Sequence, residues 1–344
     1  MLLKQLLKGL RYQVVQGTLH VEVADIFYDS RKVTPEGLFV CIVGTQRDSH
    51  DYAADVVEKG AAVLVIQHDL APGVLESMPN VTVLKFDNTR YAMAMLSAAY
   101  FGHPADEMTM IGVTGTKGKT TTTHMIRSVL TAAGHKTGMI GTNGVYYPGH
   151  HYDLNNTTPE SYELQKILRQ LADAGCAACV MEVSSQGLMM DRVAGIHYRV
   201  GVFTNLYPDH IGPGEHASFE EYRSWKGQLF QRCDIGVVNA DDENTEALLE
   251  GHTCELITYG IDKPADYRAS QEYRLLRNKT MLGVEFTLTE PDGHTLDVQV
   301  GMPGRFSIYN ALATIGVGKA LGLADEPIHQ GLRDTVVKGR VELV

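Results

Sequence analysis

Residues 108–123 read MTMIGVTGTKGKTTTT, a short apolar run followed by a glycine-rich turn and a polar segment with helical spacing. An apolar run of this length indicates a buried strand, and the downstream spacing indicates a helix. Glycines between a strand and a helix let backbone N–H groups turn toward an anion. A lysine and a hydroxyl can then reach phosphates and Mg²⁺. This stretch therefore predicts a phosphate-binding loop.

The loop is a variant of the strict P-loop pattern. The pattern G-x-x-x-x-G-K-T would need glycine at position 113, where valine stands. A purely structural glycine turn, the alternative interpretation, would not demand the Lys-Thr-Thr continuation. We therefore expect nucleotide phosphates to bind here. The expected contacts are Gly115, Thr116, Lys117, Gly118, Lys119, Thr120 and Thr121.

Downstream of this loop, apolar strands alternate with amphipathic helices, a pattern typical of a mostly parallel sheet covered on both faces. Residues 267–302 instead alternate apolar and polar positions around a Pro-Asp-Gly turn, which indicates appended antiparallel strands. The chain is thus expected to be α/β, with a doubly wound, P-loop-type central domain. Expected strands lie at 136–142, 176–185, 198–206 and 234–240, and expected helices at 119–134, 160–175, 219–231, 241–250, 307–321 and 325–334.

Residues 1–104 form a separate pattern of short β-rich runs at 38–44, 61–67 and 81–86 with helical segments between them. The segment GHPADEM at 102–108 is polar and turn-forming. We therefore expect a small N-terminal α/β domain over residues 1–104 and a central domain over residues 105–337.

Composition excludes several classes of protein. With 344 residues, 44 % of them apolar, the chain is long enough for two or three folded domains. Its 30 Lys and Arg against 41 Asp and Glu give a net charge of −11, which disfavours nucleic-acid coating and anionic membranes. It has neither a secretion signal nor a long apolar span, so its five cysteines are expected to be reduced. For Cys176 and Cys179 a buried helix-to-strand junction is favoured over metal or redox chemistry.

Together with the variant loop, a series of motifs makes the chain resemble the Mur ligases, and most closely the branch that adds the third residue of the peptidoglycan stem peptide. No single motif is decisive, but their order along the whole chain is specific. The motifs are Asp29-Ser30-Arg31, LFVCIVGTQRDSHDY at 38–52, GTKGKTT at 115–121, NNTTPES at 155–161, MEVSSQGL at 181–188 with Arg192, FTNLYPDHIGPGEH at 203–216, Lys226, VVNADD at 237–242 and PGRFSIYNALA at 303–313.

The resemblance implies an ATP-dependent amide ligase of the cytoplasm, expected to be a monomer. It would add L-lysine or meso-diaminopimelate to UDP-MurNAc-L-Ala-D-Glu through an acyl phosphate, with ATP and Mg²⁺ as cofactors. The N-terminal domain would bind the UDP part of the substrate. Family members also carry a C-terminal domain that recognises the amino acid. The chain is expected to be a truncated form with little activity, in which residues 338–344 begin the linker to that domain.

The resemblance also implies catalytic and metal-binding roles. Lys119 would neutralise the γ-phosphate, and Thr120 would ligate magnesium through its hydroxyl. Glu182 and His210 would hold a second magnesium with Lys226, which in the family carries a carbamate formed with CO₂. A carbamate supplies oxygen ligands where an ammonium would be repelled. Taken alone, these three residues are better explained as a helix cap, a loop histidine and a solvated helix lysine, but the phosphate loop upstream favours the metal site.

Substrate contacts follow from the same resemblance. Arg192 suits a carboxylate or diphosphate because its guanidinium donates two parallel hydrogen bonds, although a surface helix cation is the plain alternative. Asn310 matches an adenine-side residue, although an asparagine near a helix start is also a common cap. The expected contacts are Ser30, Thr45 and Gln46 for uridine, and Asn156, Thr157, Thr158, Ser184 and Arg192 for the muramoyl dipeptide.

Two positions depart from the family pattern. Gln186 stands where histidine is frequent, and Met190 stands where a substrate-binding glutamine is frequent. Two alternatives to the tripeptide ligase therefore stay open. One is another amide ligase, of the Mur or folate polyglutamate type, and the other is a P-loop regulator that binds nucleotide without catalysis. The N-terminal DSR and GTQ segments favour the tripeptide ligase.

Overall fold

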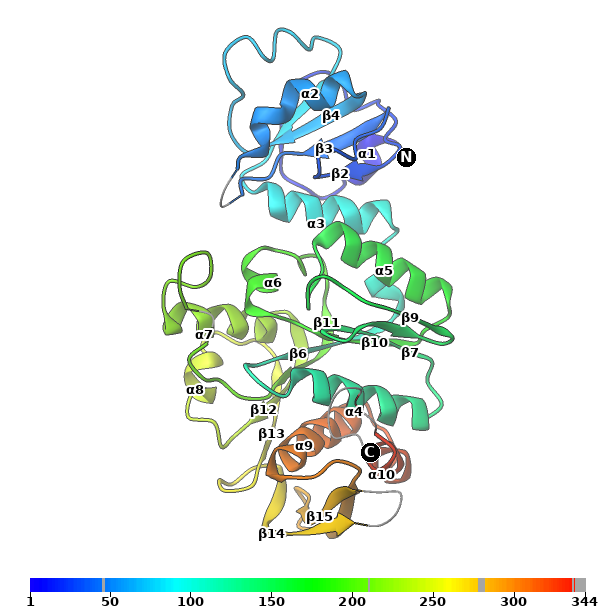
Figure 1. Cartoon of the computed structure of the whole chain (residues 1–344), viewed down its shortest axis with the longest axis vertical. Coiled ribbons are helices and arrows are strands. Elements are labelled where there is room, and N and C mark those ends of the chain that lie inside the picture. The colour runs from blue at the N-terminus through cyan, green and yellow to red at the C-terminus, as the bar shows by residue number, and fades with distance from the viewer. Residues whose placement is uncertain (45–46, 210, 278–281, 336, 338–344) are drawn as a thin grey trace. The chain divides into compact units, whose positions relative to one another are not determined.

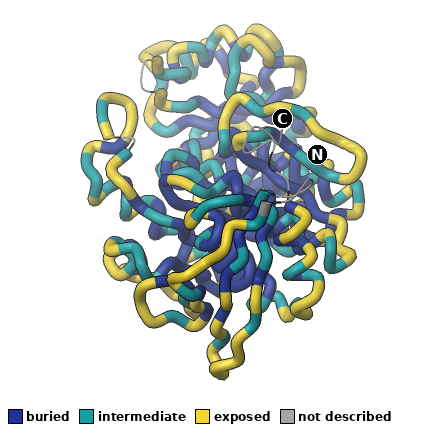
Figure 2. The backbone as a smooth tube through the Cα atoms, turned by 60° about the horizontal axis from the view of Figure 1, so that its bottom comes forward, coloured by how far each residue is buried: buried dark blue, intermediate teal, exposed yellow. Residues whose placement is uncertain are grey.

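A computed structural model of the protein describes residues 1–44, 47–209, 211–277, 282–335 and 337. The chain divides into two compact units. The first comprises Met1–Pro104, Glu160–Arg169 and Met190–Gly195, and the second comprises the remaining segments. In both units the strands are mostly buried and the connecting loops exposed (Figure 2). No helix among the described residues is long and apolar enough to cross a membrane.

The first unit is built on a five-stranded sheet in the order β1-β5-β4-β3-β2, in which only β1 runs antiparallel to its neighbour. Two apolar clusters form its core, one around Leu38 and Leu84 and one around Phe39 and Val83, because successive residues of a strand face opposite sides of the sheet. The strands are β1 (Gln13–Gln16), β2 (Ile26–Phe27), β3 (Gly37–Val40), β4 (Ala61–Ile66) and β5 (Thr82–Lys85), and the α-helices are α1 (Leu3–Leu6), α2 (Ala53–Glu58) and α3 (Thr89–Tyr100).

The second unit contains an eleven-stranded sheet in the order β16-β15-β14-β13-β12-β11-β6-β10-β7-β8-β9. Its parallel part runs from β14 to β7, and antiparallel strands extend it at both edges. The strands are β6 (Thr109–Thr114), β7 (Thr137–Gly141), β8 (Gly144–Tyr147), β9 (His150–Tyr152), β10 (Ala178–Glu182), β11 (Tyr198–Phe203), β12 (Cys233–Asn239), β13 (Glu255–Gly260), β14 (Tyr267–Arg277), β15 (Leu282–Thr289) and β16 (Thr295–Val300).

Helices α4 and α9 pack on this sheet, with α10 beside them (Figure 1). Ile111, Val113, Met125 and Ile126 are among the residues of the large apolar cluster that joins the central strand to α4. The α-helices of this unit are α4 (Lys119–Ala132), α6 (Ser185–Met189), α7 (Phe219–Gly227), α8 (Thr245–Leu248), α9 (Arg305–Ala320) and α10 (Asp325–Arg333), while α5 (Ser161–Asp173) contributes to both units.

Strand β6 lies at the centre of the parallel part, between β10 and β11. The chain continues from β6 to one side, through β7 and β10, and later to the other side, through β11 and β12. Strand order therefore reverses at β6, and doubly wound sheets bind ligands at the carboxyl ends of strands around such a reversal. The predicted phosphate loop follows β6 directly.

The predicted α/β fold with a mostly parallel central sheet and appended antiparallel strands is confirmed. The expected helix over 241–250 is only partly confirmed, because the helix spans Thr245–Leu248 alone. Asp242 instead accepts hydrogen bonds from the backbone N–H groups of Leu206 and Asn244, at 2.7 and 2.9 Å. Such side-chain bonds compete with helix formation. Strands β8, β9 and β13 were not predicted from the sequence.

Candidate functional site

The phosphate loop, residues 115–121, depends on glycine at two positions. Gly115 has φ 144° and Gly118 has φ 86°, where L-residues are strained. A Cβ atom at Gly115 would lie 2.0 Å from Thr204 Oγ1, and one at Gly118 would lie 2.8 Å from Asn310 Oδ1. Gly118 is also the N-cap of α4, so the free N–H groups and positive end of the helix dipole face the loop. This is the geometry of an anion site.

Two residues after β11 hold the loop from the neighbouring strand. Thr204 Oγ1 donates to the Lys117 carbonyl oxygen at 2.7 Å, and Asn205 Nδ2 donates to the same oxygen at 3.0 Å. In return Lys117 N–H donates to Asn205 Oδ1 at 2.9 Å, and Thr116 N–H donates to the Asn205 carbonyl oxygen at 2.8 Å. Neither residue was predicted from the sequence to contact the loop. Their position at the carboxyl end of a buried strand could have indicated it, because ligands bind at that edge of a doubly wound sheet.

Two lysine amines converge on one carbonyl oxygen of the loop. Lys119 Nζ donates to the Gly115 and Thr116 oxygens at 2.9 and 3.1 Å, and Lys226 Nζ donates to the Gly115 oxygen at 3.0 Å. Lys226 is only 2 % exposed. Burial, followed by the charge of Lys119, lowers the pKa of Lys226 well below its usual value. The loop is thus a local basic site in an acidic protein.

Tyr222 links Lys226 to the loop. The Lys226 amine lies 4.5 Å from the centre of the Tyr222 ring, and the Tyr222 hydroxyl lies 3.1 Å from Thr116 Oγ1. The Tyr222 ring also lies 5.3 Å from that of His216, whose Nε2 lies 2.9 Å from Ser185 Oγ. These contacts fix the Lys226 amine beside the loop. Lys226 is therefore not the solvated helix residue of the alternative interpretation.

Glu182 occupies the carboxyl end of β10, next to β6, and is 1 % exposed. Its Oε1 accepts a hydrogen bond from Thr142 N–H at 2.9 Å and its Oε2 accepts one from Thr142 Oγ1 at 3.2 Å. A Cβ atom at Gly141 would lie 2.4 Å from Glu182 Oε1, so glycine makes room for this carboxylate. The buried carboxylate is held by side-chain and backbone donors and does not cap a helix.

Several expected substrate residues gather around Glu182. Thr157 Oγ1 lies 3.1 Å from Thr142 Oγ1, and Thr158 Oγ1 donates to the Glu182 carbonyl oxygen at 3.0 Å. Ser184 N–H donates to Thr158 Oγ1 at 3.0 Å. The structure thus brings Thr157, Thr158, Ser184 and Glu182 together.

For three further expected site residues of this unit, the structure gives the degree of burial. Thr120 is buried in the first turn of α4, while Asn156 is exposed and Lys117 carries an exposed side chain. His210 lies outside the described residues.

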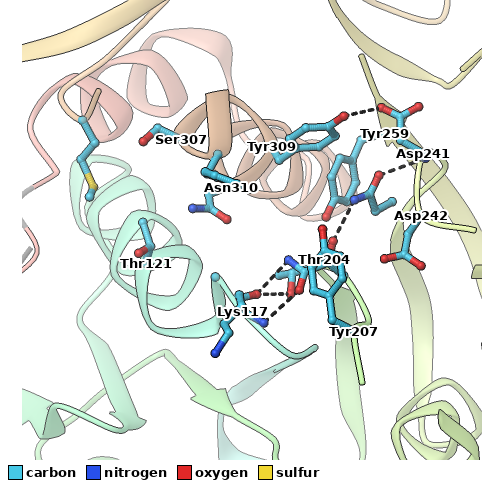
Figure 3. Close-up of a pocket in the computed structure, with 15 residues that line it drawn as sticks. Lys117, Thr121, Thr204, Tyr207, Asp241, Asp242, Tyr259, Ser307, Tyr309 and Asn310 are labelled. Carbon is cyan, nitrogen blue, oxygen red and sulfur yellow. Dashed lines mark hydrogen bonds between the residues drawn. The ribbon is translucent and has the colours of Figure 1, made fainter. Parts of the chain in front are cut away.

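A cavity of about 610 Å³ opens beside the phosphate loop. Figure 3 shows Lys117 at the bottom of the group of lining residues, Thr121 and Asn310 on the left, and Tyr309 and Asp241 at the upper right. Asn310 lies in the second turn of α9, whose N-cap is Gly304, so it is not the helix cap of the alternative interpretation. Its Oδ1 accepts a hydrogen bond from Thr122 Oγ1 at 3.3 Å. The cavity has the size and position expected for a nucleoside next to bound phosphates.

Two expected substrate residues lie in the first unit. Arg192 Nη2 forms an ion pair with Glu160 Oε1 at 2.7 Å, so this guanidinium is not an isolated surface cation. The Ser30 carbonyl oxygen accepts a hydrogen bond from Lys59 Nζ at 2.8 Å. Thr45 and Gln46 lie outside the described residues.

Asp48, His50 and His68 form a compact polar cluster in the first unit. Asp48 lies 2.5 Å from His50 Nδ1 and 2.7 Å from His68 Nε2, while His50 Nε2 accepts a hydrogen bond from Gln67 N–H at 2.9 Å. A metal on His50 Nδ1 would put the ring proton on Nε2, facing that N–H donor. The cluster is therefore a hydrogen-bond network and does not fit a metal. The five cysteines are buried and free.

Comparisons with known proteins identify the family. The model of the Mur ligase middle domain matches residues 113–318. The UDP-N-acetylmuramoyl-L-alanyl-D-glutamate--2,6-diaminopimelate ligase of Clostridium perfringens is 38 % identical, over 100 % of this chain and 69 % of that protein. The corresponding ligase 1 of Clostridium acetobutylicum is also 38 % identical, with the same shares covered.

Solved structures show the same fold. A structure of a UDP-N-acetylmuramoyl-L-alanyl-D-glutamate--2,6-diaminopimelate ligase has a TM-score of 0.77 at 21 % identity, covering 94 % of this chain and 65 % of that one. The MurF ligase of Thermotoga maritima in complex with ADP has a TM-score of 0.58 at 16 % identity, covering 90 % and 65 %. On the evidence of the family model and of relatives aligned over its whole length, the chain belongs to the Mur ligase family.

Proposed function

We propose that this protein is an ATP-dependent ligase that joins 2,6-diaminopimelate to UDP-MurNAc-L-Ala-D-Glu. The observation that carries the proposal is the convergence of Lys119 and Lys226 on the phosphate loop beside a cavity of nucleoside size. The names of the most similar relatives supply the substrates. The chain spans 69 % of the length of these relatives, and 65 % of the solved diaminopimelate ligase.

The chemistry follows from the charges that must meet. An oxygen of the substrate carboxylate attacks the γ-phosphorus of ATP, ADP leaves, and an acyl phosphate forms. The amine of the amino acid then attacks the acyl carbon, losing a proton as inorganic phosphate departs. Both reactants of the first step are anionic, so Lys119 and the N-terminus of α4 lower its barrier by stabilising charge that builds up on the phosphoryl group. Loop and cavity together hold ATP in line for this attack.

Magnesium fits the residues around the loop. A carboxylate offers about four acceptor sites, and Glu182 uses two of them, both toward Thr142. Among the described residues no cation pairs with Glu182, and a buried carboxylate without one is costly. The Thr120 hydroxyl would hold one Mg²⁺ and Glu182, with Lys226, would hold a second; when bound, the ions supply charge neutralisation at the phosphates. His210, outside the described residues, is proposed as a further ligand.

Lys226 is proposed to carry a carbamate. A neutral amine attacks CO₂ to form an N–C bond and releases one proton, and the lowered pKa of Lys226 favours the neutral amine. The product is an anion with two oxygen atoms, the ligand type that Mg²⁺ prefers. A carbamate keeps one N–H group on Nζ, which can still donate to the Gly115 carbonyl oxygen.

The remaining expected residues complete the proposal. Ser30, Thr45 and Gln46 would contact uridine, and Arg192 with Asn156, Thr157, Thr158 and Ser184 would contact the muramoyl dipeptide. We further propose that the protein acts as a cytoplasmic monomer, as its resemblance to the Mur ligases implies; gel filtration tests the monomer.

Calorimetry followed by product analysis tests this function. MgATP and UDP-MurNAc-L-Ala-D-Glu should each bind with a stoichiometry of one. With both present and each amino acid added in an equal amount, mass spectrometry should detect a small yield of the diaminopimelate amide, in preference to the L-lysine amide. Failure of MgATP to bind to the folded protein would refute the proposal, and a preference for L-lysine would correct the amino acid.

A further inference from the structure

Asp241 follows β12 and lies in the wall of the cavity, where it joins two segments far apart in the sequence (Figure 3). Its Oδ2 accepts hydrogen bonds from the N–H groups of Ile261 and Asp262, at 2.6 and 3.0 Å, and its Oδ1 accepts one from Lys263 N–H at 2.7 Å. The hydroxyl of Tyr309, on α9, donates to Oδ2 at 2.8 Å. One carboxylate therefore fixes both the turn after β13 and the first turns of α9.

This carboxylate is used mainly by the protein itself. Four donors bind it, three at Oδ2 and one at Oδ1, which takes up most of the roughly four acceptor sites that a carboxylate offers. Burial alone would raise the pKa of Asp241, but the hydrogen bonds from Ile261, Asp262, Lys263 and Tyr309 lower it overall. Asp241 is thus an anion whose charge is stabilised by hydrogen-bond donors of the protein itself. Any effect it has on a ligand passes through the groups that it holds.

One of the groups that Asp241 holds, the Tyr309 side chain, lines the cavity. The Tyr309 ring lines it next to Asn310, which is also in the wall. Arg305, one turn earlier on α9, donates two hydrogen bonds from Nη2 to Asp262, at 2.8 and 2.7 Å. The turn after β13 and the start of α9 are therefore connected twice, through Tyr309–Asp241 and through Arg305–Asp262. Of the four residues in these two connections, Asp241 and Tyr309 line the cavity, whereas Arg305 and Asp262 do not.

We propose that Asp241 is a positioning residue for the nucleoside part of ATP, because it orients the Tyr309 ring, which lines the cavity, and links this part of α9 to the 261–263 turn. This inference rests on the proposed ATP-dependent function. The phosphate loop does not depend on Asp241, since Thr204, Asn205 and Lys226 hold it. Asp241 accordingly contributes to affinity for adenosine and not to affinity for the triphosphate.

The test compares two ligands, MgATP and magnesium tripolyphosphate, by calorimetry on the whole chain. Asp241→Asn keeps the shape of the side chain but turns an NH₂ group toward backbone N–H donors, and Tyr309→Phe removes only the hydroxyl. The matched control is Asp266→Asn. Asp266 also anchors a turn beside β13, by accepting bonds from Thr258 N–H and Thr258 Oγ1, both at 2.7 Å, but it does not line the cavity.

Asp241→Asn should weaken MgATP binding about tenfold, the effect of one charge-assisted hydrogen bond, and leave tripolyphosphate binding within about twofold. Tyr309→Phe should act in the same direction, and the double variant should lose less than the sum of the single variants. Asp266→Asn should change neither ligand. Equal losses for both ligands, or no loss in either Asp241→Asn or Tyr309→Phe, would overturn the inference. If the unmodified chain does not bind MgATP, the proposed function fails instead.

Discussion

Lys226 Nζ lies 3.0 Å from the carbonyl oxygen of Gly115, a contact that joins α7 to the phosphate loop across 111 positions of sequence. The same oxygen accepts a hydrogen bond from Lys119 Nζ at 2.9 Å. Like charges so close together, in a site from which water is excluded, are unfavourable unless one amine is neutral or an anion lies nearby. Burial and the charge of Lys119 lower the pKa of Lys226, so the site disfavours the charge on this buried amine.

Replacing Lys226 by methionine should therefore separate stability from function. Lys226→Met keeps the apolar stem and removes a buried amine, while Lys119 still supplies a donor to Gly115. The free energy of unfolding should rise by about 1 kcal/mol, because burial of an amine is costly. Diaminopimelate-dependent release of phosphate from ATP should be lost.

Urea unfolding, followed by the fluorescence of the single tryptophan, Trp225, measures the stability. Lys136→Met is the control, since that lysine is exposed in the same unit and should change stability by less than about 0.5 kcal/mol. A loss of more than about 2 kcal/mol in Lys226→Met would mean that the amine is a structural requirement.

Two glycines of the second unit form a matched pair for testing the loop. Gly118 and Gly134 have φ values of 86° and 84°, so alanine costs about the same 1 kcal/mol of backbone strain at either. Only at Gly118 would the new Cβ meet a neighbour, Asn310 Oδ1, at 2.8 Å. Gly118→Ala should weaken MgATP binding about tenfold or more, and Gly134→Ala should leave it unchanged. Equal affinities in the two variants would show that the approach of Asn310 to the loop is unimportant for ATP.

Local features of the site were predictable from the sequence. The order strand, glycine turn, helix places the phosphate loop after β6, because the chain has few ways to pass from a buried parallel strand into a helix. Glu182 was expected within the strand at 176–185, and it is the last residue of β10. Each of these inferences uses residues within one supersecondary unit.

Partners that meet through strand order were not predictable. Thr204 and Asn205 reach the loop because β11 pairs with β6, and Thr142 reaches Glu182 because β7 pairs with β10. Neither pairing can be obtained from hydrophobic periodicity, which sets the faces of a strand but not its neighbours. For the same reason the contact of Asp241 with Tyr309, 68 positions away, had no local signal.

The Asp48–His50–His68 cluster should make the stability of the first unit depend on pH. Burial lowers the pKa of His50 below 6.5, so on acidification the unfolded chain takes up a proton that the folded one does not, and stability falls. Hydrogen bonds to Asp69 and Asp48 raise the pKa of His68, so its contribution is present at low pH and lost as pH rises. The two effects oppose each other near neutrality.

His68→Gln removes the opposing effect of His68, so that only the effect of His50 remains. The stability of this unit should therefore fall more steeply between about pH 7.5 and 5.5 than in the unmodified protein. Hydrogen exchange of Gln67 N–H, which donates to His50 Nε2, reports on this region directly. His20→Gln, an exposed histidine of the same unit, is the control. A pH dependence in His68→Gln that matches the unmodified protein would contradict the opposing roles of the two histidines.

Thr142 should determine how well the protein uses Mg²⁺, because its backbone N–H and hydroxyl are the donors that hold Glu182. Thr142→Val removes the hydroxyl and keeps the N–H group. It should weaken the magnesium-dependent part of ATP binding about 10- to 100-fold, as loss of a group that orients a ligand does. Glu182→Gln should abolish this part. Calorimetry with ATP in excess Mg²⁺ and in EDTA separates the magnesium-dependent part from the rest.

In EDTA both variants should bind ATP as the unmodified protein does, since the loop and cavity are intact. Thr131→Val is the matched control, because the Thr131 hydroxyl donates to the Arg127 carbonyl oxygen at 2.8 Å on the exposed side of α4. If Thr142→Val and Glu182→Gln weaken ATP binding equally with and without Mg²⁺, the buried carboxylate supports the loop mechanically and magnesium lies elsewhere.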